Sequence, residues 1–225
     1  AAELEAAGIS RQRIVEVPNG VEIPAIRATP SQYADAIYVG NFSQGAAHKA
    51  FDVLIEAFGK AHQLEAGMRL RLFGGGDSRR WQTLAEDQGS GSSVVFEGKT
   101  EDVWAAHRQA GFLVLPSRME GLSNALLEAM ASGLSAVVSD IPGNVAVVRH
   151  GIEGLVVPVG DVQALAEAMV RLYRSPDLRA RMGQAARARV MDLFAIEHVA
   201  ARLESVYAQA IGTGLERRPF LNFED

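Results

Sequence analysis

Residues 112–133 read FLVLPSRMEGLSNALLEAMASG, and this stretch decides the fold class. It opens with a short apolar run, Phe112–Leu115, which has the length of a strand. Small and polar residues follow from Pro116, and Leu122–Met130 then carries apolar side chains at helical spacing. A continuous apolar run is typical of a strand that is buried on both faces, as in a parallel sheet. The stretch therefore predicts one strand–loop–helix unit of an α/β protein.

The same alternation continues along the chain in both directions. Short apolar runs lie at Ile14–Val17, Ala36–Val39, Leu70–Phe73, Val94–Phe96, Phe112–Leu115, Ala136–Ser139 and Leu155–Val157. Stretches with helical spacing separate or follow them, at Phe51–Phe58, Trp81–Ala85, Leu165–Leu172 and Val199–Tyr207. We therefore expect a doubly wound, mostly parallel α/β sheet of about six strands, a Rossmann-like fold with right-handed connections.

This pattern divides the chain into three segments. Residues 1–32 form a lead-in segment, with a short helix that ends at Gly8, a first strand and a connector. Residues 33–196 form the Rossmann-like domain itself. Residues 197–225 contain a last helix, which we expect at about Glu197–Ile211, and an irregular tail after Gly212.

Composition excludes several classes of protein. The 225 residues include 22 basic and 27 acidic side chains, and the net charge of −5 argues against a nucleic-acid partner. The absence of cysteine excludes disulfides, thiolate catalysis and cysteine-ligated metals. No apolar run approaches the ~18 residues that span a bilayer, and the first residues lack the features of a signal peptide. The five histidines show no ligand spacing, so no bound metal is expected.

The loop after the strand at 112–115 is the main candidate for a ligand site, because doubly wound sheets bind ligands beyond the carboxyl ends of their strands. The helix start offers the backbone N–H groups of Gly121, Leu122, Ser123 and Asn124, whose partial positive charge suits a phosphate. Glu120 precedes the helix and Glu128 lies about two turns into it, an offset on the order of 10 Å. This offset exceeds the ~5 Å that separates the two catalytic carboxyl groups of a retaining glycoside hydrolase. It fits two carboxylates that hold the two ends of one ligand.

Simpler interpretations remain open on spacing alone. A glutamate inside a helix is usually solvated, and Ser123 or Asn124 can serve only as an N-cap. Gly74 and Gly75 can form a flexible turn or allow a ligand to approach the backbone. Lys49 stands at a helix start, where the dipole disfavours a cation, so it is either solvated or close to an anion.

Taken in order, these motifs resemble the group 1, or GT4-type, family of retaining glycosyltransferases with the GT-B fold. The family's Glu-x7-Glu signature corresponds to Glu120 and Glu128, and a Glu-Ala-Met-Ala-x-Gly run follows it. Further similar segments are Val17–Val21, Val39–Gly40, Lys49–Phe58, Leu72–Gly76, Val95–Gly98, Ser139–Asn144 and Gly154–Pro158. The resemblance leaves out only Thr213–Asp225.

The resemblance implies the C-terminal, donor-binding half of such an enzyme, with a nucleotide-diphosphate sugar as substrate and no metal or other cofactor. It also implies an acceptor-binding N-terminal domain of the same polypeptide as partner, against which the last helix packs. The 225 residues alone are then expected to bind the donor weakly and to lack transferase activity. The family's products are cell-surface polysaccharides, lipopolysaccharide and glycolipids. They imply transfer of a hexose-type sugar in the cytoplasm or at the inner face of the membrane, with membrane-linked acceptors among the options.

The resemblance also assigns roles to individual residues. Glu128 would hold the ribose hydroxyls, Glu120 the hydroxyls of the donor sugar, and Lys49 the leaving diphosphate. The N–H groups of Leu122, Ser123 and Asn124 would meet the diphosphate. The other donor-site positions are Gly40, Asn41, Gly74, Gly75, Lys99 and Thr100, of which the last two lie at the base pocket.

The chain departs from the family pattern at three positions. Asn41, in an expanded loop Asn41–His48, stands where the family has an arginine that neutralises the diphosphate, and Arg118 and His48 are alternative cations. Ala146 replaces a frequent glutamate, and Ser135 replaces a frequent proline. These changes keep open a catalytically impaired nucleotide-sugar-binding domain. An α/β interaction or receiver-like module without a nucleotide site is a further alternative.

Overall fold

The computed structural model describes residues 2–42 and 47–212, and its centre is a six-stranded sheet in the order β3-β2-β1-β4-β5-β6. The strands are β1 (Ala36–Val39), β2 (Leu70–Phe73), β3 (Val94–Gly98), β4 (Phe112–Leu115), β5 (Ser135–Ser139) and β6 (Gly154–Val157). Every neighbouring pair is parallel. The prediction of a doubly wound α/β sheet is confirmed, and the sheet is entirely parallel. The order reverses between β1 and β4, so the crevice where such sheets bind ligands lies at the ends of these two strands.

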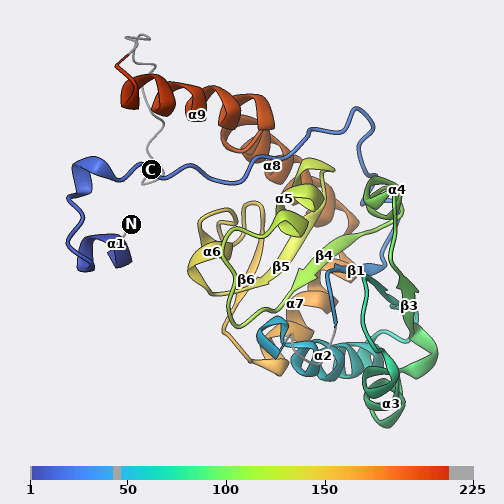
Figure 1. Ribbon diagram of the computed structural model, residues 1–225. Coiled ribbons are helices and arrows are strands. Elements are labelled where there is room, and N and C mark those ends of the chain that lie inside the picture. Colours follow the sequence, from blue (N-terminus) through green and yellow to red (C-terminus); the bar gives the residue numbers. More distant parts are fainter. Residues whose placement is uncertain (1, 43–46, 213–225) are drawn as a thin grey trace.

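Helices cover both faces of the sheet (Figure 1). The described α-helices are α1 (Ala2–Ala6), α2 (Phe51–Leu64), α3 (Arg79–Asp87), α4 (Val103–Arg108), α5 (Asn124–Ala131), α6 (Pro142–Val145), α7 (Val162–Arg174), α8 (Pro176–Leu193) and α9 (Ile196–Ala210). Short 3₁₀ helices occur at Arg11–Arg13, Ala47–Lys49 and Gly91–Ser93. Helix α2 packs against α7 on one side of the sheet, and α5 packs against α8 on the other.

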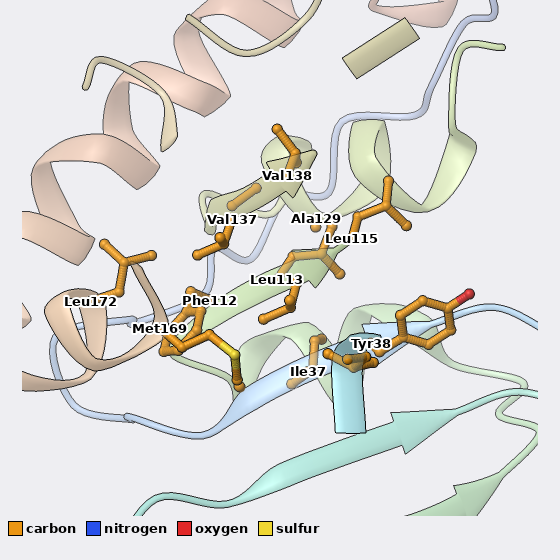
Figure 2. Close-up of a cluster of buried hydrophobic side chains, with 14 of the residues drawn as sticks. Ile37, Tyr38, Phe112, Leu113, Leu115, Ala129, Val137, Val138, Met169 and Leu172 are labelled. Atoms are coloured by element: carbon orange, nitrogen blue, oxygen red, sulfur yellow. The ribbon is translucent and has the colours of Figure 1, made fainter. Parts of the chain in front are cut away.

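The core lies between the central strands and these two layers. Figure 2 shows Phe112 and Leu113 of β4 among side chains from β1 and β5, with Met169 and Leu172 of α7 beside them. All residues of β4 and β5 are buried, so both faces of these strands are covered. This explains why the apolar runs in the sequence are continuous rather than alternating.

The prediction of a first strand at Ile14–Val17 is wrong. This segment has no regular structure, and Val15 is 44% exposed. The segment lies away from the sheet, so no strand is beside it to accept its hydrogen bonds. The pairing in this region is a single parallel bridge between Val21 and Ala195. The expected C′ position of Gly8, just past the first helix, is confirmed by a positive φ of 86° and a hydrogen bond from its N–H to the carbonyl of Glu5.

Helix α8 was not predicted, because arginine and alanine interrupt its apolar stripe. Two of its arginines, Arg179 and Arg187, are nevertheless buried. Arg179 Nε donates to the carbonyl of Pro30 at 2.7 Å, and Arg187 donates to the carbonyl of Pro24 at 2.9 Å. These bonds attach the lead-in connector to the back of the domain.

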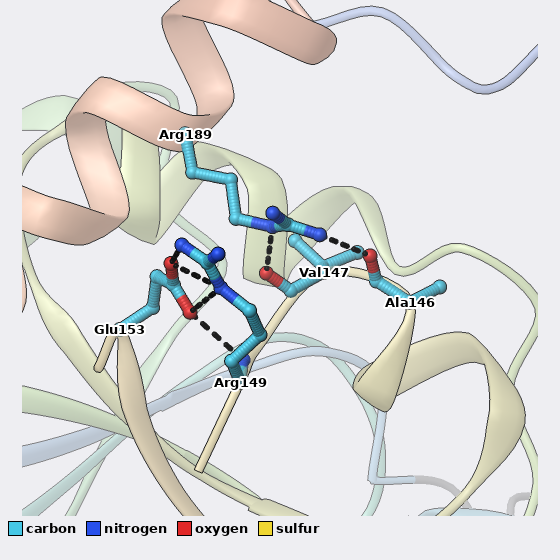
Figure 3. A network of polar contacts seen from close by, with 5 residues as sticks. All are labelled: Ala146, Val147, Arg149, Glu153 and Arg189. Carbon is cyan, nitrogen blue, oxygen red and sulfur yellow. Dashed lines mark hydrogen bonds and ion pairs between the residues drawn. The ribbon is translucent and has the colours of Figure 1, made fainter. Parts of the chain in front are cut away.

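A third arginine of α8 holds the loop between α6 and β6 (Figure 3). Arg189 donates to the carbonyls of Val147 and Ala146, at 2.9 and 3.1 Å. Beside it, the fully buried Glu153 accepts hydrogen bonds from the backbone and side chain of Arg149. This cluster fixes the segment that follows β5.

Helix α9 extends past the edge of the sheet (Figure 1), close to the predicted position of the last helix. Tyr207 and Ile211 at its far end are 62% and 72% exposed. None of the helices in residues 2–42 and 47–212 is long and apolar enough to cross a membrane. The predicted tail Thr213–Asp225, and residues 43–46 of the expanded loop, lie outside the described residues.

Candidate functional site

The loops after β1, β2 and β3 contact one another at the carboxyl edge of the sheet. The N–H of Gly40 donates to the carbonyl of Phe73, and the N–H of Gly74 donates to the carbonyl of Gly98, at 2.9 and 2.8 Å. A Cβ on Gly74 would lie 1.8 Å from the carbonyl oxygen of Gly40, so only glycine permits this contact. Gly74 is therefore explained by packing of two loops, a role that the sequence did not suggest.

A cavity of about 420 Å³ opens beside these loops. Ten residues line it: Val39, Gly40, Asn41, Phe73, Gly74, Lys99, Thr100, Glu101, Val103 and Glu128. Six of them, namely Gly40, Asn41, Gly74, Lys99, Thr100 and Glu128, are positions that the sequence singled out for the site. The fold thus brings together residues from four separate loops and helices. Gly75 lies just outside, under the side chain of Lys99, whose Cε would be 2.8 Å from a Cβ at this glycine.

Glu128 lines this cavity from α5 and is half-buried. Burial raises the pKa of its carboxyl group above the ordinary value. Within the part of the chain that the structure describes, no side chain or backbone group donates to this carboxylate. A carboxylate that is desolvated without a protein donor costs free energy, so its position favours a role in binding a ligand.

Glu120 and Lys49 are not among the residues that line the cavity; they form an ion pair with each other, with side chains that are 12% and 21% exposed. Glu120 Oε1 also accepts a hydrogen bond of 3.0 Å from the hydroxyl of Ser117. The anion that the position of Lys49 suggested is therefore present within the protein itself. Sequence reasoning singled out both residues of the pair but did not predict that they meet.

Lys49 leads into a strained backbone position. Ala50, at the N-cap of α2, has φ 54° and ψ 44°, and no other described non-glycine residue has a positive φ. A side chain in this left-handed region costs about 1 kcal/mol or more. Ala50 is fully buried and its carbonyl accepts from Leu54, so the surroundings hold it there. This position directly follows Lys49 and separates it from the first turn of α2.

Arg118 contacts the segment that leads into α2. Its guanidinium makes two hydrogen bonds with the carboxylate of Asp52, at 3.0 and 2.7 Å, and these bonds lower the pKa of Asp52. Its backbone N–H donates to the carbonyl of His48. These contacts connect the loop after β4 to the start of α2, and the suggestion of Arg118 as an alternative cation for a diphosphate stays a prediction.

The start of α5 leaves its first amides open. The helix begins at Asn124, two residues later than the sequence predicted. No described acceptor takes the N–H groups of Gly121, Leu122, Ser123 or Asn124. Gly121 is exposed, and a Cβ there would meet nothing within 4 Å, so space is open above this turn. These amides carry the partial positive charge of the helix start, and they follow β4, which borders β1 where the strand order reverses.

Asn19 supports this turn from the lead-in segment, a contact that the sequence did not reveal. Its Nδ2 donates to the carbonyl of Leu122 at 3.0 Å and to Oδ1 of Asn124 at 2.9 Å. The Asn19–Gly20 pair is an ordinary turn signal, so nothing local in the sequence distinguished it.

The residues described contain no group of three or more histidine, cysteine, aspartate or glutamate side chains able to hold a metal ion.

Comparison with known proteins shows which family this domain matches. A sequence profile of the family described as glycosyl transferases, group 1, matches residues 34–175. An exopolysaccharide phosphotransferase from Streptomyces coelicolor is 38% identical over 141 residues, which cover 61% of this chain and 15% of the relative. A phosphatidyl-myo-inositol mannosyltransferase from Mycobacterium leprae is 30% identical over 209 residues, or 89% of this chain and 54% of the relative.

Solved structures share the fold. Anabaena HepE, solved in complex with UDP, superposes with a TM-score of 0.83 over 92% of this chain and 61% of its own, at 18% sequence identity. The chain thus spans about half the length of the mannosyltransferase and a small part of the phosphotransferase.

Proposed function

The chain belongs to the group 1 glycosyltransferases, and from this premise we propose that it binds a nucleotide-diphosphate sugar as the donor half of a retaining enzyme. One observation carries the proposal: Glu128 lines a cavity at the ends of β1, β2 and β3, and the open amides of α5 lie at the neighbouring strand end. This arrangement offers an acceptor for ribose hydroxyls and donors for a diphosphate, side by side on one helix.

The transferase chemistry would depend on charge at the leaving group. When the bond between the sugar and the diphosphate breaks, negative charge grows on the phosphate oxygens. Preorganised donors aimed at that charge lower the barrier, and the amides of Leu122, Ser123 and Asn124 can supply them. Lys49, which is ion-paired with Glu120, would contribute a cation near the leaving group, and Glu120 would accept from hydroxyls of the sugar. Lys99 and Thr100 would contact the base within the cavity.

The proposals about the acceptor site and the products rest on the greater length of the relatives and on their names. We propose that the acceptor site belongs to an N-terminal domain of the same polypeptide, which α9 would contact. The products would be a cell-surface glycan or a glycolipid, with a hexose-type sugar transferred to an acceptor that can be membrane-linked. The described chain alone would then bind the donor but not transfer its sugar.

A catalytically impaired domain is the second candidate, and Asn41 is the observation that favours it. This residue lines the cavity where the family has an arginine, and it brings no charge to a diphosphate. Incubation of the full polypeptide with UDP-, GDP- and ADP-sugars separates the two. Release of nucleoside diphosphate supports an active enzyme, whereas binding without release supports the impaired domain.

Thermal unfolding with the same panel tests donor binding directly. A ligand at about 100 times its Kd stabilises the folded state by about 2.7 kcal/mol. We expect one class of nucleotide sugar to raise the midpoint and the others to raise it less. If no member of the panel shifts the midpoint at millimolar concentration, the proposed function is wrong.

A further inference from the structure

Three buried polar side chains lie behind the loop that carries Glu120. Ser117 follows β4, Ser139 ends β5, and Asn144 belongs to α6; they are 0%, 1% and 0% exposed. Burying such polar groups costs free energy unless they are hydrogen-bonded. The resemblance to the family assigned no role to any of the three.

They form one continuous chain of hydrogen bonds. Asn144 Nδ2 donates to the carbonyl of Ser139 at 3.0 Å and to its Oγ at 3.1 Å. The hydroxyl of Ser139 donates to the carbonyl of Ser117. The hydroxyl of Ser117 in turn donates to Glu120 Oε1. The chain therefore connects the end of β5 to a carboxylate at the mouth of the crevice.

The backbone holds the same loop from the same side. A Cβ on Gly143 would lie 1.9 Å from the carbonyl oxygen of Gly121 and 2.7 Å from that of Glu120. The turn into α6 is thus in direct contact with the turn that precedes α5. Glu120 has little freedom to move toward the core.

One oxygen of Glu120 is therefore fixed and the other is available. Oε1 accepts from both Ser117 and Lys49. Among the described residues, no group donates to Oε2. Two donors on one oxygen restrict the rotation of the carboxylate, so the direction of the second oxygen is set by protein contacts.

We propose that Ser117 is a positioning residue that aims Glu120 Oε2 at a hydroxyl of the donor sugar, with Ser139 and Asn144 holding Ser117 in place. This inference rests on the proposed function, because it needs a sugar beside Glu120. It makes Ser117 a determinant of sugar recognition that never touches the ligand. The nucleotide part of the donor, held at Glu128 and at the amides of α5, would not depend on it.

The test compares two ligands that differ only by the sugar. Titration calorimetry would measure the Kd of UDP and UDP-glucose, or of GDP and GDP-mannose, whichever pair binds wild-type protein, for wild type and for Ser117→Ala. We expect about ten-fold weaker binding of the nucleotide sugar, because Glu120 Oε2 is then no longer held in the direction of the sugar hydroxyl. Affinity for the nucleoside diphosphate should stay within two-fold.

Ser135→Ala is a matched control, because Ser135 is a buried serine at the other end of β5 whose hydroxyl lacks a partner in the described residues. It should leave both affinities unchanged. Ser139→Ala provides a second variant should Ser117→Ala fail to fold. It should weaken binding of the nucleotide sugar by a smaller factor and again leave the affinity for the nucleoside diphosphate nearly unchanged.

An equal loss for both ligands would show that Ser117 only supports the loop, and it would overturn the inference. Unchanged affinity for both ligands would overturn it as well. If wild type binds the nucleoside diphosphate and the nucleotide sugar with equal affinity, the inference fails while nucleotide binding stands. If wild type binds neither ligand, the proposed function itself fails.

Discussion

Lys49 and Glu120 form an ion pair although 71 positions separate them in the sequence. One residue precedes α2 and the other precedes α5, so the pair connects the loops that follow β1 and β4. These strands are neighbours at the point where the strand order reverses. The contact therefore places a cation and an anion at the position where doubly wound sheets bind their ligands.

Replacing Lys49 tests whether this cation serves the leaving group. Lys49→Met should lower the release of nucleoside diphosphate by the full polypeptide about 100-fold, because a charge aimed at the developing phosphate charge is lost. Donor affinity should fall less. Lys60→Met, on the exposed side of α2, is the control and should have no effect on turnover. A Lys49 variant with wild-type turnover would contradict the role.

Glu128→Gln should raise the stability of the folded protein at pH 7 and weaken nucleotide binding. Burial raises the pKa of this carboxyl, so the folded state favours its protonated form. The free energy of unfolding therefore falls as pH rises from the ordinary pKa of the group through its raised value. At pH 7 the glutamine variant should unfold at a higher temperature than wild type, and this gain should vanish below about pH 4.

The same variant should bind the nucleotide about 10- to 100-fold more weakly, because charge-assisted bonds to the ribose hydroxyls are lost. Calorimetric titration at pH 7 measures this. Greater stability together with unchanged affinity would mean that Glu128 is not a ligand-binding residue.

Ala50→Gly should stabilise the protein by about 0.5 kcal/mol, because glycine adopts a positive φ without the steric cost that alanine bears. Ala57→Gly, inside α2, should instead destabilise it by about 1 kcal/mol or more. Urea unfolding of both variants measures the two changes. A loss of stability on Ala50→Gly would argue against strain at this position.

His107 should make the protein sensitive to mild acid. Its ring is fully buried, bonds to the hydroxyl of Ser132 at 3.0 Å, and has its pKa lowered to about 4 by burial. The unfolded chain takes up a proton near pH 6.5 while the folded chain does not, so stability falls as pH drops from about 6.5 to about 4. The loss should total roughly 3 kcal/mol.

His107→Gln should remove most of this slope, measured as the urea midpoint at several pH values. His62→Gln, on α2, serves as the control. An unchanged slope in the His107 variant would show that other groups cause the acid sensitivity.

The sequence predicted the sheet well because its signal is local. Continuous apolar runs such as Phe112–Leu115 identify buried parallel strands without any knowledge of their neighbours. Ile14–Val17 gave the same signal and is not a strand, because a strand also needs a partner, which no short run encodes. Helix α8 was missed for the opposite reason, since its buried arginines find carbonyl partners in distant segments.

The candidate site divides in a similar way. Residue type and spacing made Glu120, Glu128 and Lys49 candidates, and the resemblance to the family assigned their roles. Asn19 and Ser117 did not stand out, because small polar residues are common in loops and their partners lie in other parts of the fold. The left-handed backbone of Ala50, next to Lys49, was also not predicted, because alanine seldom adopts it.

The most direct measurement is a crystal structure of the chain with the nucleotide sugar that stabilises it most. We predict that diphosphate oxygens lie within hydrogen-bond distance of the N–H groups of Leu122, Ser123 and Asn124. The ribose should contact Glu128, and the base should occupy the cavity beside Lys99 and Thr100. Well-defined ligand density at any other place on the domain would contradict the account.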